Sequence, residues 1–332
     1  MITLEQIKSV MIGHAVGDAL GVPMEFTSRE YLHTQPVTYM MGRGTYAQVP
    51  LGCWSDDTSM SLCTLDSLTK NTVDYDDIMN NFAQWLFGAK YTSTGEVFDA
   101  GTTCCEAIKN YRSGKPALKC GIADVDANGN GSLMRIHPMS LYLYQSGIEI
   151  TNATRIIHNT SALTHAHARS KIACGIYSYI LWALLCEPCK QSVVDGILFA
   201  ASDYFVKQKY GQDFASDAIR NCLTLQSVTF GSSQAPKAEY VPACEDMVQS
   251  GGYVVDTLDA AVWCLMTTNS YEECVLKAVN LGRDTDTTAA VVGGLAGALY
   301  GYDAIPEQWK NDLAKREYIE AMCAQAFSAW TK

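Results

Sequence analysis

Glycine recurs every fourth residue in two segments that lie far apart in the chain. The six positions are Gly13, Gly17, Gly21, Gly293, Gly297 and Gly301. Residues four apart share one face of an α-helix. Each glycine inside a helix costs roughly 0.5–1 kcal/mol relative to alanine, so six of them need a compensating interaction. We therefore predict two helices whose backbones approach closely at these positions. The glycines could also make room for a ligand near the helix ends. Loops at the glycines are the alternative.

Apolar residues follow the helical period through most of the chain. The predicted helices cover residues 3–21, 56–71, 75–89, 170–186, 257–269, 270–282 and 306–330. Alternating strand patterns, a strand–helix–strand rhythm and internal repeats are not recognisable. A stretch rich in Gly, Ser and Pro at 231–242 is expected to be a long loop. The sequence thus predicts one all-α domain over residues 1–332.

Composition excludes several classes of function. The net charge of −11 argues against nucleic-acid binding, because a basic surface is needed to displace counterions from phosphates. The first residues carry charge where a signal peptide needs an apolar core. The apolar run 172–186, about 15 residues long, is shorter than the roughly 20 residues that span a bilayer, so it predicts a buried helix and no membrane partner.

Cysteine usage indicates a reducing compartment. The 13 cysteines are scattered and odd in number in a chain of 332 residues, whereas disulfide frameworks are typical of small secreted chains. We expect reduced thiols and a cytoplasmic location. The pair Cys186 and Cys189 is interpreted as a helix end with two inert thiols, with a redox or metal-binding pair as the alternative.

Four segments place acidic residues beside hydroxyl groups where a helix is expected to begin or end. Each one alone is explained by N-capping, which stabilises a helix by about 1 kcal/mol. Two carboxylates about 4 Å apart repel by on the order of 4 kcal/mol at an effective dielectric of 20, so convergence of these segments would require protons or cations. The residues are Asp18 and Glu25; Ser55, Asp56, Asp57 and Thr58; Asp99, Thr102 and Thr103; and Asp284, Asp286 and Thr287.

Divalent cations are the better candidates if the acidic segments converge. Lysine is absent from all four segments, and Arg283 is the one cationic residue that adjoins any of them. Carboxylate and hydroxyl oxygens favour hard ions such as Mg²⁺, Mn²⁺ or Ca²⁺ over Zn²⁺. Two acidic pairs suggest two ions.

Two further segments carry polar chemistry. The string NGNGSLMRIHP at 128–138 places glycine-rich backbone before an apolar helical stretch, which suits either phosphate binding or a plain turn. It lacks the lysine of a P-loop and the preceding strand of a dinucleotide fingerprint. The second segment, THAHARS at 164–170, contains His165 and His167. These histidines are interpreted either as a polar helix cap or packed core residues, or as contacts to a ligand.

These segments, in this order, resemble the ADP-ribosylglycohydrolase family. The resemblance runs from GHAVGDALGVPMEF through WSDDTSMSL, FDAGTT, NGNGSLMRIHP, THAHARS and SGGYVVDTLDAAVW to GRDTDTTAAVVGGLAGALYG, about residues 6–302. It implies a compact, orthogonally packed all-α fold with two Mg²⁺ ions in a central cleft, Mn²⁺ being a possible substitute. The metal ligands implied by motif match are Ser55, Asp56, Asp57, Asp284, Asp286 and Thr287.

The resemblance also implies roles around the metals. Glu25 and Asp99 match the acids expected to act as general acid or base, without a choice between them. The implied substrate contacts are Asn130, Gly131, Ser132, His165 and Tyr253. Arg283 stands where many members have Gly; it could pair with Asp284, face bound phosphates or narrow the range of acceptors.

The implied reaction is hydrolysis of the glycosidic bond that joins ADP-ribose to a modified side chain, with arginine linkage favoured. The expected partner is an ADP-ribosylated protein or a small ADP-ribosyl conjugate, and the enzyme is expected to be a monomer. A two-metal phosphohydrolase acting on ADP-ribose-type nucleotides is one alternative. A non-catalytic, crystallin-like ADP-ribose binder is another.

Overall fold

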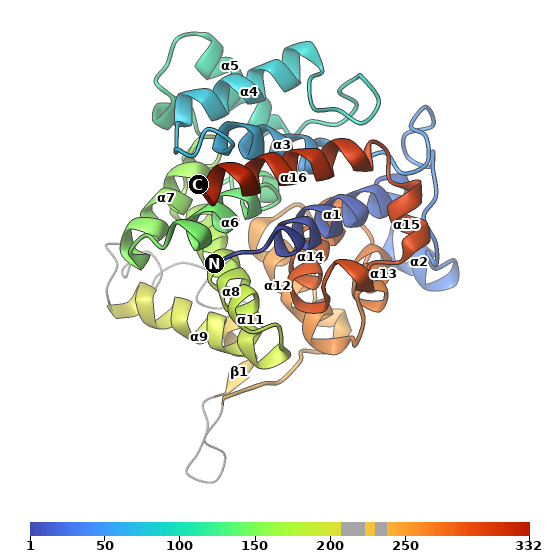
Figure 1. Cartoon of the computed structure of the whole chain (residues 1–332). Helices are drawn as coiled ribbons and strands as arrows, with labels where there is room; N and C mark the ends of the chain where they lie inside the picture. The colour runs from blue at the N-terminus through green and yellow to red at the C-terminus, as the bar shows by residue number, and fades with distance from the viewer. Residues whose placement is uncertain (207–222, 230–237) are drawn as a thin grey trace.

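The computed structural model is built almost entirely from helices (Figure 1). It describes residues 1–206, 223–229 and 238–332. The α-helices are α1 Leu4–Gly21, α2 Arg29–Thr34, α3 Asp56–Leu68, α4 Tyr75–Gly88, α5 Thr102–Arg112, α6 His137–Ser146, α7 Ile150–Ala162, α8 Ala168–Cys186, α9 Lys190–Val206, α11 Leu223–Gln226, α12 Val254–Thr267, α13 Tyr271–Asn280, α14 Thr285–Tyr300, α15 Glu307–Asp312 and α16 Arg316–Trp330. Single 3₁₀ turns lie at Val22–Met24, Ala117–Lys119, Asn130–Ser132, Glu245–Met247 and Tyr302–Ala304.

One short hairpin interrupts the helical architecture. Strand β1, Val228–Thr229, pairs antiparallel with β2, Glu239–Tyr240. The predicted loop at 231–242 therefore contains a strand, while its part 231–237 lies outside the described residues. The all-α prediction is confirmed.

Helices α1 and α14 lie side by side at the centre of the molecule, although residues 22–284 separate them in the chain (Figure 1). A Cβ atom added to Gly13 would lie 2.5 Å from the carbonyl oxygen of Gly293, and one added to Gly297 would lie 2.0 Å from that of Ser9. A Cβ on Gly21, the last residue of α1, would lie 2.3 Å from the Cα of Asp286. The glycine spacing thus lets α14 approach α1 and carry its first turn against the end of α1.

Gly301 does not belong to this contact, so its assignment to the packing face is wrong. Helix α14 ends at Tyr300, and Gly301 caps it with a φ of +86° and no atom near its missing Cβ. A left-handed residue after a helix is a position that glycine occupies without steric strain.

Gly17→Ala is expected to destabilise the protein by about 1–3 kcal/mol, the usual cost of overpacking a tight core. Its Cβ would lie 2.0 Å from the carbonyl oxygen of Ala289, so α1 and α14 would have to separate. Gly88→Ala is the matched control, because no atom lies within 4 Å of its Cβ position at the end of α4. Thermal unfolding of both variants checks this; equal midpoints would contradict the close-contact interpretation.

The helix predicted for 306–330 is in fact two helices. Helix α15 ends at Asp312 and α16 begins at Arg316, after Lys315 at a φ of +49°. Between them, the Ala314 N–H donates to the carbonyl oxygen of Gly52 at 2.9 Å. Contact with the loop before α3 therefore breaks a segment whose apolar period is continuous.

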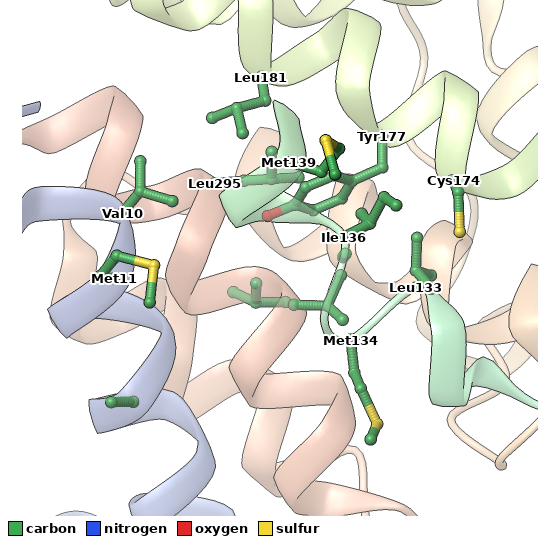
Figure 2. Packing of buried hydrophobic residues seen from close by; sticks show 14 of the residues in the cluster. Val10, Met11, Leu133, Met134, Ile136, Met139, Cys174, Tyr177, Leu181 and Leu295 are labelled. Carbon is green, nitrogen blue, oxygen red and sulfur yellow. The ribbon is translucent and has the colours of Figure 1, made fainter. Parts of the chain in front are cut away.

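One hydrophobic cluster extends from Ile2 to Trp330. Figure 2 shows its centre, where Val10 and Met11 of α1 and Leu295 of α14 lie near Tyr177 of α8. Leu133, Met134, Ile136 and Met139, which follow the NGNGS string, enter the same cluster (Figure 2). This packing anchors the glycine-rich turn at Asn130–Ser132 to the central helices.

The apolar run 172–186 lies in α8 and is largely buried within this cluster. Among the described helices, none combines the length and hydropathy that crossing a bilayer requires. Cys186 ends α8 and Cys189 precedes α9, and the cysteines of the described residues are all free thiols.

Candidate functional site

Helix α3 begins at a cap that two segments share. Ser55 is the N-cap residue, and its Oγ accepts a hydrogen bond from the Asp57 N–H at 3.4 Å. Asp18 of α1 accepts from the N–H and the hydroxyl of both Ser55 and Thr58, at 2.7–3.0 Å. The capping interpretation therefore holds for Ser55, while Asp18 fixes the first turn of α3 against α1.

Helix α14 begins differently. Asp284 occupies the N-cap position but makes no capping hydrogen bond; its Oδ2 instead accepts from Asn130 Nδ2 at 2.8 Å. The Thr287 hydroxyl in the first turn donates to Asp57 Oδ2 at 3.3 Å, across 230 positions in sequence. Acidic segments from the beginning and the end of the chain thus meet at the facing starts of α3 and α14.

Burial makes this group of acids electrostatically costly. Asp57 is fully buried, Asp286 is 1% exposed and Asp56 is 6% exposed. Burial, together with the neighbouring carboxylates, raises the pKa of each of these three acids well above its ordinary value. Within residues 1–206, 223–229 and 238–332, none of them forms an ion pair with Lys or Arg.

Two buried carboxylate oxygens in the group have no hydrogen-bond partner, namely Asp57 Oδ1 and Asp286 Oδ2. The Ser55 hydroxyl lies within 3.0 Å of both Asp18 Oδ1 and Asp57 Oδ2 but has one hydrogen to donate. Unpartnered buried carboxylate oxygens are uncommon because their desolvation is not compensated. A hard divalent cation fits such a donor set of carboxylate and hydroxyl oxygens.

A second group of carboxylates adjoins the first. One oxygen each from Glu25, Asp99 and Asp286 lies within 4.8 Å of the others, a spacing that a metal ion can bridge. Glu25 and Asp99 are the predicted acid–base residues, and Asp286 is a predicted metal ligand. The structure therefore brings the predicted acid–base residues to the predicted ligands, and Glu25 and Asp99 are near enough to share in holding an ion.

Glu25 sits on the loop that follows α1. Its Oε2 accepts a hydrogen bond from the Tyr46 hydroxyl at 2.6 Å. Burial and the charge of Asp99 raise the pKa of Glu25 to about 8, and the Tyr46 hydrogen bond offsets part of this rise. A carboxyl group with a pKa near neutrality can both donate and accept a proton at physiological pH.

A cavity of about 200 Å³ opens beside these acids. Its rim includes the exposed residues Gly101 and Thr102, so it reaches the surface. The predicted site residues that line it are Glu25, Asp56, Asp99, Gly131, His165, Asp284 and Thr287. Ser55, Asp57 and Asp286 lie behind this lining, buried among the helix starts.

The glycine-rich turn forms part of the cavity wall through Gly129 and Gly131. A Cβ on Gly131 would lie 2.9 Å from Cys104 Sγ and 3.0 Å from His165 Cε1, so the turn has no room for a side chain there. The N–H of Asn130 donates to Gly252, and that of Val254 donates to Asn128. This pairing with the start of α12 holds the turn in place.

Two of the predicted substrate contacts have other partners. Asn130 Nδ2 donates to Asp284 and to Thr257 Oγ1, so this side chain orients an acid of the site. Ser132 is fully buried, and its hydroxyl accepts from Ser161 Oγ at 2.9 Å on the core side. These hydrogen bonds indicate structural roles for both side chains. A contact from this turn to the substrate would therefore have to come from the backbone of the turn.

Tyr253 and Arg283 occupy the edges of the site. Tyr253 precedes α12, is half-buried, and has the Arg169 guanidinium 5.6 Å from its ring centroid. The exposed Arg283 donates to Gln249 Oε1 at 3.3 Å and forms no ion pair with Asp284 among the described contacts. Its backbone, at a φ of +67°, exchanges hydrogen bonds with Phe26 and Thr27, which ties the Glu25 loop to the start of α14.

Two residues of the site have no role predicted from the sequence: Asp18, which lies in one of the acidic segments, and Tyr46. The hydroxyl-rich string at 55–58 is a signal for a partner of the Asp18 type, because its N–H and O–H groups need an acceptor. Tyr46 comes from an irregular loop with no periodicity, so its contact with Glu25 depends on tertiary structure alone.

A helical protein whose cleft gathers carboxylates from both ends of the chain has the donor set of a hydrolase that uses hard divalent cations. The family model described as ADP-ribosylglycohydrolase matches residues 1–332. The chain belongs to the ADP-ribosylglycohydrolase family. The resemblance noted in the sequence, and with it the assignment to glycohydrolase enzymes, is confirmed.

Curated relatives span the whole chain. The present chain is 30% identical to the "ADP-ribosylarginine hydrolase Tri1" of Serratia proteamaculans, over 98% of this chain and 80% of that protein. It is 28% identical to the "ADP-ribosyl-[dinitrogen reductase] glycohydrolase" of Rhodospirillum rubrum, over 95% of this chain and 94% of that protein. A solved structure titled "ADP-ribosylglycohydrolase-related protein complex" matches with a TM-score of 0.75 and 26% identity, covering 98% of each chain.

Proposed function

We propose that this protein is a Mg²⁺-dependent hydrolase that cleaves the bond between ADP-ribose and an arginine side chain of a modified protein or small conjugate. The observation that carries the proposal is the buried carboxylate group with unpartnered oxygens beside an open cavity. The arginine linkage is supported by the names of two relatives, the Tri1 proteins of Serratia proteamaculans and Pseudomonas putida, at 30% and 28% identity. Sequence identity to the "ADP-ribosylhydrolase ARH3" of Bos taurus, whose name specifies no arginine linkage, is lower, at 22%.

Two metal ions would be held at the facing starts of α3 and α14, with Mn²⁺ as a possible substitute for Mg²⁺. When bound, they would supply positive charge that neutralises the acids and orients the ribose hydroxyls. The proposed ligands are Ser55, Asp56, Asp57, Asp284, Asp286 and Thr287.

Glu25 is the proposed general acid and base. Tyr46 donates to its Oε2, which leaves Oε1 free to face the substrate. A protonated Glu25 can give its proton to the departing side chain, and the resulting carboxylate can then take a proton from an attacking water. Asp99 would raise the proton affinity of Glu25 and stabilise positive charge that develops on the sugar carbon.

The neutral wall of the cavity is proposed to hold the phosphate end of the substrate. A protein with a net charge of −11 cannot attract a diphosphate by bulk charge, so local N–H donors must do so. Gly129, Gly131 and His165 form this part of the lining. Tyr253 adjoins it through its backbone bridge to Gly129.

Product analysis with a panel of Arg-, Ser- and base-linked ADP-ribose substrates, each with Mg²⁺ or with a chelator, tests the proposal. We expect intact ADP-ribose from the arginine conjugate in the presence of Mg²⁺ and none in the presence of chelator. Release of AMP from free ADP-ribose would instead identify a two-metal phosphohydrolase. Binding of ADP-ribose without turnover of any conjugate would identify a non-catalytic binder.

A further inference from the structure

Arg135 is a buried cation for which the proposed reaction has no use. It lies in the NGNGSLMRIHP string, is fully buried, and has its guanidinium carbon 4.7 Å from the centroid of the Phe82 ring. Among the described residues it has no carboxylate partner, and its Nε and Nη1 atoms lack hydrogen-bond acceptors. Burying a charge without an ion pair is expensive, which suggests a function for this residue.

The hydrogen bonds that Arg135 does make lead to the cavity wall. Its Nη2 donates to Thr164 Oγ1 at 2.7 Å and to the carbonyl oxygen of Thr160 at 3.3 Å. Thr164 Oγ1 in turn lies 2.9 Å from Nδ1 of His165. The His165 ring then faces the glycine-rich turn, because a Cβ on either Gly129 or Gly131 would lie 3.5 Å from its Nε2.

Hydrogen-bond polarity favours one direction for this chain. A guanidinium has donors and no acceptor, so Thr164 Oγ1 must accept from Arg135. The single hydroxyl hydrogen of Thr164 is then free to be donated to His165 Nδ1. The thiol of Cys104, which also lies near Thr164, is a weaker acceptor than an imidazole nitrogen.

We propose that Arg135, acting through Thr164, is a positioning residue that holds His165 as the tautomer with its proton on Nε2, so that the ring presents a fixed N–H donor to an oxygen of the substrate. Burial and the charge of Arg135 lower the pKa of His165 to about 3, so the ring is neutral at physiological pH. A neutral ring that accepts at Nδ1 carries its one proton on Nε2. The identity of the substrate oxygen, on the diphosphate or the adjoining ribose, rests on the proposed function.

Thr164→Val and Thr164→Ser form the matched pair that tests this proposal. Valine keeps the shape of threonine and removes the hydroxyl, whereas serine keeps the hydroxyl. Nitrogen-15 NMR of the imidazole rings reports the tautomer, and the protein has 6 histidines, so comparison with His165→Gln assigns the signal. We expect protonated Nε2 in the wild type and in Thr164→Ser, and a changed tautomer ratio in Thr164→Val. A wild-type ring protonated on Nδ1, or an unchanged ratio in Thr164→Val, would overturn the proposal.

Steady-state kinetics provides the second measurement. In Thr164→Val, KM for the ADP-ribosyl conjugate is expected to rise about tenfold, the worth of one hydrogen bond, with a smaller change in kcat because the contact holds the substrate throughout. Thr164→Ser is expected to restore KM. A changed tautomer with an unchanged KM would refute the substrate contact. The NMR measurement needs no substrate, so an inactive wild-type protein would refute the proposed function while the tautomer is still tested.

Discussion

Asp286→Asn is expected to reduce kcat/KM by about a thousandfold or more, the upper range for loss of one preorganised electrostatic contact in an active site. Asp286 is 1% exposed in the first turn of α14; its Oδ2 has no hydrogen-bond partner, and one of its carboxylate oxygens lies within 4.8 Å of carboxylate oxygens of Glu25 and Asp99. Asparagine has nearly the same shape but no charge to hold a divalent ion. The measurement is steady-state release of ADP-ribose at saturating Mg²⁺.

The same substitution should make the metal-free protein more stable. Besides burial, the charges of Glu25 and Asp57 raise the pKa of Asp286, so removing its charge relieves repulsion. We expect the thermal midpoint of metal-free Asp286→Asn at pH 8 to rise by about 2 °C or more, since each kcal/mol shifts a protein of this size class by a few degrees. Loss of activity with a lowered midpoint would indicate a structural role instead.

Asp303→Asn is the control for both measurements. Asp303 is exposed in the 3₁₀ turn after α14, outside the cavity lining. We expect it to change neither the turnover nor the midpoint, because the carboxylate is solvated. Retention of full activity by Asp286→Asn under the same conditions would contradict the assignment of Asp286 as a ligand.

Removal of Mg²⁺ is expected to abolish turnover, and its return should stabilise the protein in a pH-dependent way. A ligand at a hundredfold excess over its Kd stabilises the folded state by about 2.7 kcal/mol. In the metal-free protein the pKa of Glu25 is about 8 and that of Asp18 about 6, while those of Asp57 and Asp286 are well above the ordinary value. Protons therefore compete with Mg²⁺ below about pH 8.

The sign of the pH effect follows from these raised pKa values. The folded metal-free protein holds protons that the unfolded chain releases near pH 4, so its stability falls as the pH rises from about 4 to about 8. Bound Mg²⁺ should remove most of that fall, and the Mg²⁺-induced rise in midpoint should be larger at pH 8 than at pH 6. Differential scanning fluorimetry across this range measures it; a midpoint indifferent to Mg²⁺ at pH 8 would contradict the metal site.

The local pattern of apolar and capping residues predicted most of the helices. The helices predicted over 56–71 and 270–282 begin in the structure behind the N-cap residues Ser55 and Ser270, since a hydroxyl beside free N–H groups has the same effect in any fold. The glycine spacing predicted the contact between α1 and α14, because a missing side chain every four residues has few other uses in a helix. These features depend on neighbours in the sequence and are therefore readable from it.

Other features lay beyond local pattern. The break at Leu313–Lys315, the β1–β2 hairpin and the place of Gly301 outside the packed face arise from contacts or chain reversals that periodicity does not encode. The side chains of Asn130 and Ser132 illustrate the same limit. Their position in the motif was compatible with a substrate contact, and only the packed structure directs one to Asp284 and the other to the core.

The amino-acid sequence contains the helices, the acids and the small residues that let two helix backbones touch, because each of these is a property of residues near one another in the chain. Tertiary packing decides which acids lie together in one region that excludes water. Asp57 and Thr287 become neighbours because α1 and α14 pack without side chains between them, which sets the start of α14 against that of α3. Electrostatic energy depends on distance and burial, and both exist only once the chain has folded.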